Sequence, residues 1–259
     1  MGWAVIAGGS RGIGIHIARA LARRNYNLLL VARNAGELDE SKNSLEKEFH
    51  IQVETISCDL SLPESANLIS GFCDSGELDV RVLCNAAGLG GSTDFPDLAM
   101  NDLRTMIRMN IESSMALCLL FIPLLKKNAP SYILNIASMA AFAPIPVKNI
   151  YSSSKSALLF FSYSLKQQLK DDKISVSCLC PGPVFTKPSI EKETIKQLGW
   201  LGKQMAVTAE TVGELTVKGM LRRKMIIVPG RLATMVSFLL RILPRRLLTH
   251  IFYSFRKQE

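Results

Sequence analysis

The sequence predicts an α/β protein built on one doubly wound sheet of seven parallel strands, with helices on both faces. Short apolar runs alternate with helical patterns along most of the 259 residues, and this order sets parallel strands side by side with helices between them. The second run, NLLLVAR, is apolar nearly throughout, as expected of a strand buried on both faces. No linker is long or polar enough to mark a second domain.

Seven runs supply the predicted strands, which cover residues 3–7, 27–33, 52–60, 80–88, 132–138, 174–180 and 224–230. A helix follows the first strand directly, because Ile13, Ile17, Ala20 and Leu21 repeat at the spacing of one helix face. Further helices are predicted over residues 35–48, 64–72, 102–127, 151–170 and 208–223. We expect residues 1–230 to form one domain and residues 231–259 a helical tail.

The composition excludes several classes of protein. Hydrophobic residues make up 48% and charged residues 20%, which is typical of a globular chain and not of a disordered one. Lys and Arg outnumber Asp and Glu by 31 to 22, and this excess suits an anionic ligand or a membrane surface. Nucleic acid is disfavoured, since the basic residues form no stripe with aromatic ones. No uncharged apolar stretch reaches the ~18 residues of a spanning helix.

The cysteines and histidines predict neither disulfides nor a metal centre. The six cysteines show no CxxC spacing and, with no signal peptide recognised, we expect reduced thiols in an intracellular protein. His16, His50 and His250 lie far apart, which disfavours a zinc site or a histidine-based triad.

A glycine-rich turn joins the first strand to the first helix. Gly8, Gly12 and Gly14 let the backbone turn tightly and let a phosphate approach, while the helix N-terminus adds free N–H groups and positive potential. An ordinary tight turn explains the glycines equally well on their own. Their place at the first strand-to-helix junction of an alternating chain favours a dinucleotide site.

Tyr151 and Lys155 stand four residues apart where an apolar helical run begins. Positions i and i+4 share one face of a helix, so the hydroxyl and the ammonium can enter the same pocket. A solvated helix start would carry the same pair, and these two residues alone do not decide.

The Gly-x-x-x-Gly-x-Gly spacing resembles that of the short-chain dehydrogenase/reductase family, and later motifs match that family in order over residues 3–230. The matching positions are Asp59, the Asn85–Gly88 turn, Asn110, Ser138 thirteen residues before Tyr151, the Tyr151/Lys155 pair and Pro181-Gly182. Alanine replaces the family's second asparagine in the Asn-Ala-Ala-Gly turn. The resemblance implies a Rossmann-type fold and an oxidoreductase that reduces a carbonyl with a nicotinamide cofactor.

The resemblance also implies a role for each catalytic residue. Tyr151 is the expected general acid in reduction, or base in oxidation, and Ser138 the donor to the substrate oxygen. Lys155 is expected to bind the nicotinamide ribose and to lower the pKa of Tyr151, and Asn110 to hold a water that links the lysine to solvent. Free tyrosine titrates near ~10, and a drop of ~3 units needs about 4 kcal/mol, which the lysine and an oxidised nicotinamide would share.

NADP(H) is the expected cofactor. Arg11 lies in the glycine loop and Arg33 follows the second strand, where an NAD enzyme carries an acid for the ribose 2′-OH. Two guanidiniums suit a 2′-phosphate, although they could also be solvated surface residues. The expected cofactor-binding residues are Gly8, Ser10, Arg11, Gly12, Ile13, Gly14, Arg33, Asn34, Asp59, Leu60, Asn85, Ala86, Ala87, Gly88, Tyr151, Lys155, Pro181, Gly182, Val184 and Thr186.

Substrate selectivity is expected from the loop after Gly88, from Met139–Val147 and from a lid over residues 187–205. These segments are mostly apolar, which favours a hydrophobic ketone or a 3-oxoacyl chain over a sugar. Oxidation of an alcohol or hydroxysteroid in the cell is the alternative direction, because the same residues catalyse the forward and the reverse reaction. A dinucleotide sensor without turnover is the rival from another class, and the intact Ser-Tyr-Lys set argues against it.

The tail carries an apolar stripe with basic flanks. The stripe residues are Leu247, Leu248, Ile251, Phe252 and Phe255, and the flanks are Arg245, Arg246, Arg256 and Lys257. The stripe either docks on the body or a second subunit, or lies on a membrane surface, where it could make the protein a scaffold. By resemblance we expect a homodimer or homotetramer that pairs through the helices bearing Asn110 and Tyr151. We expect a cytoplasmic location, free or on the membrane face.

Overall fold

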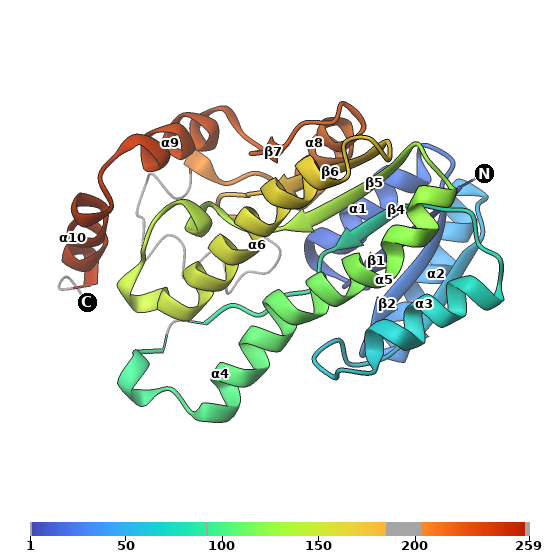
Figure 1. The fold of residues 1–259 in the computed structure, drawn as a ribbon, viewed down its shortest axis with the longest axis horizontal. Coiled ribbons are helices and arrows are strands. Elements are labelled where there is room, and N and C mark those ends of the chain that lie inside the picture. Colours follow the sequence, from blue (N-terminus) through green and yellow to red (C-terminus); the bar gives the residue numbers. More distant parts are fainter. Residues whose placement is uncertain (1, 92, 185–203, 257–259) are drawn as a thin grey trace.

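The structure is a computed structural model that describes residues 2–91, 93–184 and 204–256 (Figure 1). Within these residues, seven strands form one sheet in the order β3-β2-β1-β4-β5-β6-β7, and all neighbouring pairs are parallel. The strands are β1 Trp3–Ala7, β2 Asn27–Ala32, β3 Val53–Ser57, β4 Val80–Asn85, β5 Ser131–Ile136, β6 Ile174–Leu179 and β7 Ile226–Ile227. The predicted seven-stranded, doubly wound parallel sheet is confirmed.

The strand order reverses beside β1, and this reversal fixes where a ligand can bind. The chain runs outward from β1 to β3, then returns to place β4 on the other side of β1. The connections therefore leave the sheet on opposite faces, and a crevice opens at the carboxyl ends of β1 and β4. The segments after β1, β4, β5 and β6 meet at this one edge.

Two helical layers cover the sheet (Figure 1). One layer packs on the Ala4 and Ile6 side of β1, and it consists of α1 Gly12–Ala22, α2 Ala35–Phe49 and α8 Ala209–Leu221. The other packs on the Val5 side, and it consists of α3 Ser65–Ser75, α5 Ser113–Lys127 and α6 Asn149–Gln168. Successive strand residues point to opposite faces, so a strand apolar at every position supplies both cores.

The helix predicted over residues 102–127 is interrupted by a π-helical turn. α4 Met100–Ile107 passes into η2 Arg108–Glu112, which holds Asn110, and then into α5. By length and composition the segment Met100–Lys127 could cross a membrane. Its buried side chains, Leu117 and Phe121 among them, pack on the sheet core, and 39% of its most apolar stretch is buried.

The tail predicted over residues 231–259 is helical where it is described. α9 Arg231–Ile242 packs on η3 Met139–Phe142, and α10 Arg245–Arg256 contacts η4 Pro146–Lys148. Leu248 of the predicted stripe is buried, whereas Leu247 is exposed. The α10 stripe therefore docks partly on the body of the protein. The predicted lid lies outside the described residues over 187–203, so both the lid and the division of the chain at residue 230 stay predictions.

Candidate active site

A cleft of about 650 Å³ opens at the carboxyl edge of the sheet. Most of the predicted site residues line it: Gly8, Ser10, Arg11, Gly12, Ile13, Gly14, Arg33, Asn34, Leu60, Ala86, Ala87, Gly88, Ser138, Tyr151, Lys155, Pro181, Gly182 and Val184. Asp59, Asn85 and Asn110 do not line it, and Thr186 lies outside the described residues. The volume falls in the range of small-molecule sites.

The glycine turn forms a cradle that only glycine can build. Gly8 and Gly12 have φ angles of +90° and +59°, in the left-handed region. A Cβ on Gly14 would lie 2.0 Å from the carbonyl oxygen of Gly8. Among the described residues no side chain caps the N-terminus of α1 at Arg11, so its first amides remain available to an anion. These features fit a pyrophosphate.

An acid that we did not predict lies at the Arg11 end of the cleft. Glu37 accepts a hydrogen bond from Ser10 Oγ at 3.0 Å, and its other oxygen lies 3.6 Å from an Arg11 nitrogen. Asn34 caps α2 by accepting from the Glu37 amide at 3.2 Å. An acid three residues after an N-cap is a common helix-start pattern, so the sequence could have placed Glu37 on α2 but not beside Arg11.

The side chains of Asp59 and Asn85 form hydrogen bonds with other residues of the chain. Asp59 accepts hydrogen bonds from the amide and the hydroxyl of Ser61, and these bonds hold the pKa of its carboxyl below the usual value. Asn85 is buried, and its amide donates to Asn135 Oδ1 at 2.8 Å and to Ser114 O at 3.3 Å. The Asn85 side chain is thus engaged in a polar network inside the core, and the expected contact of residue 85 with a cofactor stays a prediction.

Lys155 is held under the cleft by burial and by one backbone carbonyl. Its Nζ donates to Ile136 O at 2.9 Å and lies 5.9 Å from the centre of the Tyr151 ring. Burial lowers the pKa of Lys155 to about 8, since the charged form loses its hydration. Tyr151 and Lys155 occupy the first two turns of α6, and the loop after β5 brings Ser138 to them.

The pKa of Tyr151 departs from expectation. Burial raises the pKa of its phenol, while a hydrogen bond with Ser138 lowers it. Lys155 does not lower the pKa of Tyr151 as we expected, because its ammonium donates to Ile136 O. Burial, which raises the pKa of Tyr151, is the largest contribution. We expected part of the lowering of this pKa from an oxidised nicotinamide, which is not a group of this chain.

Asn110 connects the π-helical turn to the rest of the site. Its Oδ1 accepts from the Leu89 amide at 2.7 Å, and its Nδ2 donates to Leu89 O at 2.9 Å and to Ser154 Oγ at 3.0 Å. Ser154 donates in turn to Tyr151 O at 2.8 Å. Ser154 was not among the predicted site residues, although it stands within the Tyr-x-x-x-Lys motif.

The fold is a doubly wound parallel sheet whose carboxyl-edge cleft carries a glycine cradle together with Ser138, Tyr151 and Lys155. The chain belongs to the short-chain dehydrogenase family, because the family model described as short chain dehydrogenase matches residues 2–197.

Two relatives and one solved structure illustrate the likeness. Very-long-chain 3-oxoacyl-CoA reductase-A of Danio rerio is 33% identical over 207 residues, 74% of this chain and 63% of that protein. The Homo sapiens very-long-chain 3-oxoacyl-CoA reductase is 30% identical over 200 residues, with the same two shares. The chain thus spans less than two thirds of these relatives. L-sorbose reductase from Gluconobacter frateurii, solved with NADPH and L-sorbose, has a TM-score of 0.79 and 25% identity, covering 88% of this chain and 95% of that one.

Proposed function

We propose that this protein is an NADPH-dependent reductase that converts a hydrophobic ketone or a 3-oxoacyl thioester into an alcohol. The observation that carries the proposal is the meeting of Ser138, Tyr151 and Lys155 on the wall of the cleft that also holds the glycine cradle. A proton donor, an oxygen-binding hydroxyl and a cation beside a dinucleotide cradle are the groups that carbonyl reduction needs.

Each group of the chain then has one task. When bound, the nicotinamide supplies the hydride that reduces the carbonyl carbon. Ser138 Oγ donates a hydrogen bond to the carbonyl oxygen, and the Tyr151 hydroxyl gives that oxygen its proton. Lys155 binds the ribose hydroxyls, and the hydrogen bond with Ser138 favours the phenolate left on Tyr151. Asn110 holds the Leu89 segment against α6, and we keep for it the role of positioning a water beside Lys155.

The choice of NADP(H) is supported by Arg11 and Arg33 on the cleft wall. Both side chains are more than half exposed, and Arg33 lies 4.0 Å from Asp59, so both can reach a 2′-phosphate. Glu37 opposes this choice, because a carboxylate beside Arg11 repels the same phosphate. NADPH in the L-sorbose reductase structure is consistent with the arginines.

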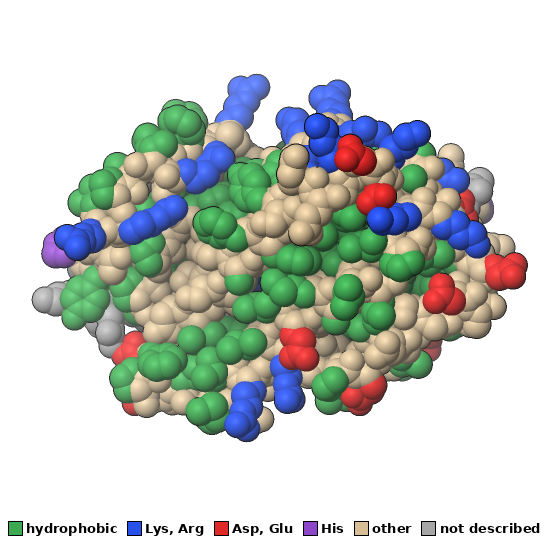
Figure 2. Space-filling model, in the orientation of Figure 1, with side chains coloured by type: hydrophobic (Ala, Val, Ile, Leu, Met, Phe, Trp, Pro, Cys, Tyr) green, Lys and Arg blue, Asp and Glu red, His purple; other side chains and the backbone are tan. Residues whose placement is uncertain are grey.

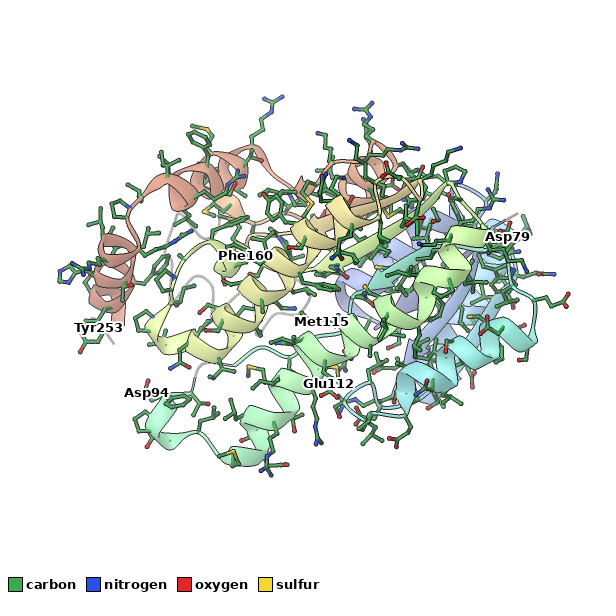
Figure 3. The ribbon with its side chains drawn as sticks, viewed as in Figure 1. Asp79, Asp94, Glu112, Met115, Phe160 and Tyr253 are labelled. Atoms are coloured by element: carbon green, nitrogen blue, oxygen red, sulfur yellow. The ribbon has the colours of Figure 1, made fainter. Side chains whose placement is uncertain are left out.

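The substrate class rests on the relatives and on the apolar wall. Both mammalian and fish relatives are named for very-long-chain 3-oxoacyl-CoA, and Leu89 and Met109 line the cleft. We keep the homodimer or homotetramer as part of the proposal. Large side chains are exposed on the face of α5 and α6 (Figure 3 labels Met115 and Phe160 there), namely Leu119, Phe160 and Tyr163.

The test follows NADPH oxidation by the wild-type chain against 3-oxoacyl thioesters and hydrophobic ketones graded by chain length. NADH replaces NADPH in a parallel series. We expect turnover with NADPH that Tyr151→Phe abolishes and that Tyr163→Phe, an exposed tyrosine of the same helix, leaves unchanged. Tight NADPH binding without turnover of any substrate would instead favour a dinucleotide sensor. Faster oxidation of the matching alcohols at cellular cofactor ratios would favour the dehydrogenase direction.

A further inference from the structure

α9 exposes a stripe of large apolar side chains that the body of the protein does not cover. Met235, Phe238, Leu239 and Ile242 are 67%, 59%, 51% and 59% exposed. They repeat at the i, i+3, i+4, i+7 spacing of one helix face, and we call them the α9 stripe. The opposite face of α9 carries buried Ala233 and packs on the core around η3. The packing of α9 on the body of the protein therefore does not involve the α9 stripe.

The residues around the α9 stripe are basic, with no acid among them. From Arg231 to Arg256 the chain contains five arginines and no aspartate or glutamate. Figure 2 shows basic side chains among the hydrophobic ones over α9 and α10.

Two of these arginines attach the tail to the body. Arg241 stacks on the Phe142 ring at 5.3 Å, and Arg245 donates to Phe142 O and to Leu240 O. Arg231 and Arg246 are exposed.

We propose that the α9 stripe docks this protein on an anionic lipid bilayer. An apolar helix face flanked by arginines lies in a membrane interface with its side chains in the acyl region and its charges on the headgroups. A second copy of the chain is the poorer occupant. A twofold contact through α9 would bring together two tails whose residues 231–256 contain five arginines and no acid, so their charges would repel each other.

The docked orientation follows from what α9 and α10 touch. They pack on η3 and η4, which lie between Ser138 and Tyr151 in the chain. A bilayer on the α9 stripe therefore lies beside the substrate end of the cleft. If the proposed reduction of hydrophobic carbonyls holds, this is the side from which a membrane-dissolved substrate would enter. The docking itself does not depend on that activity.

The experiment is flotation of the full chain with vesicles of phosphatidylcholine, alone or mixed with phosphatidylglycerol. We expect binding to the mixed vesicles, little to the neutral ones, and loss at high salt, because counterions screen the headgroups. Phe238→Ser with Leu239→Ser should lower the partition coefficient at least about tenfold, from the apolar area no longer buried. Arg231→Gln with Arg246→Gln should lower it about fivefold for each charge.

Matched controls separate docking from general surface effects. Leu68→Ser with Phe72→Ser removes exposed apolar side chains of α3, and Arg104→Gln with Arg222→Gln removes exposed charges elsewhere. We expect both control pairs to bind vesicles as the wild type does. Equal loss in the controls, or no binding of the wild type to mixed vesicles, would overturn the proposal.

Two further measurements distinguish the remaining outcomes. Sedimentation of the Phe238/Leu239 variant should give the wild-type mass, whereas a smaller mass would make the α9 stripe a contact between copies and overturn the proposal. NADPH oxidation with a water-soluble ketone, run without vesicles, should be the same in the α9 variants and the wild type. A wild-type chain that floats but never oxidises NADPH would contradict the proposed reductase and leave the docking intact.

Discussion

The side-chain amide of Asn110 donates a hydrogen bond of 3.0 Å to the hydroxyl of Ser154, and both side chains are buried. Ser154 donates onward to the backbone carbonyl of Tyr151 at 2.8 Å. Asn110 is also bonded twice to Leu89, which lines the cleft. One serine thus joins the π-helical turn and the Leu89 loop to the helical turn that presents the tyrosine.

We expect Ser154→Ala to lower kcat about tenfold with little change in KM. The loss of two hydrogen bonds frees the first turn of α6 to shift, and a small shift of a proton donor slows the chemical step more than binding. The variant should also lose about 1–3 kcal/mol in its free energy of unfolding. Ser152→Ala is the control, since within the described part of the chain that hydroxyl donates only to Asn149 O, at 3.1 Å. Equal kinetic effects of the two variants would contradict the assignment.

Glu37→Gln should raise the preference for NADPH over NADH. The change removes a negative charge beside the expected 2′-phosphate and frees Ser10 and Arg11 from the carboxylate. Exposed charge pairs contribute up to about 1 kcal/mol, so the ratio of kcat/KM values should rise about two- to fivefold. Glu40→Gln alters an exposed acid of the same helix and should leave the ratio unchanged. A lower ratio in Glu37→Gln would show that the carboxylate assists NADPH binding.

Lys155 should cost the protein stability at neutral pH. Its pKa is about 8 in the fold against 10.5 for free lysine. Below pH 8 Lys155 is protonated in both the native and the unfolded state, and burial of its charge lowers the free energy of unfolding by about 3 kcal/mol. Between about 8 and 10.5 the unfolded chain binds more protons than the native one, so stability rises with pH over that window.

Lys155→Met therefore should raise the free energy of unfolding at pH 7 by about 1–2 kcal/mol, the loss of the bond to Ile136 O offsetting part of the gain. The advantage should shrink as the pH rises from about 8 to 10.5. Urea unfolding across this range measures both quantities. Lys127→Met, at an exposed position, is the control and should show no such trend. An advantage that grows with pH would reverse the proposed sign.

Gly14→Ala should disrupt both the fold and cofactor binding. Its new methyl group would lie 2.0 Å from the carbonyl oxygen of Gly8, a backbone atom that cannot move aside without shifting the glycine turn. We expect a loss of more than about 3 kcal/mol, or no folded protein. Gly71→Ala in α3 meets nothing within 4 Å and should stabilise the chain by about 0.5–1 kcal/mol. Thermal unfolding of both variants tests the contrast, and a small loss of stability in Gly14→Ala would contradict it.

Residue patterns predict the parts of this protein that depend on neighbours in the chain. Alternation of strand and helix, the glycine turn and the Tyr-x-x-x-Lys spacing all have local signatures, and they led to the correct sheet and to most of the cleft wall. Contacts between distant segments have none. The proximity of Glu37 to Arg11 depends on how α2 packs beside the glycine loop, and the direction of the Asn85 side chain depends on its pairing with β5.

The tail illustrates a second limit of prediction from pattern. Both α9 and α10 carry apolar residues at helical spacing, and spacing alone does not say which face meets the body. The predicted stripe lies on α10, where Leu248 is in fact buried, whereas Phe238 of α9, which is exposed, was not part of the prediction. Only the packing on η3 and η4 decides between them.

The π-helical turn Arg108–Glu112 also changes how the long helix must be counted. A π-turn holds about one residue more than an α-turn, so every side chain after it is rotated by roughly 100° from its regular position. The two halves of Met100–Lys127 therefore differ in angular phase, and a single helical wheel drawn across them assigns the wrong face to α5. Removing one residue from the turn would restore a continuous spiral and rotate α5 against the sheet. The face that α5 turns toward the sheet therefore depends on the number of residues in this turn, which a substitution leaves unchanged.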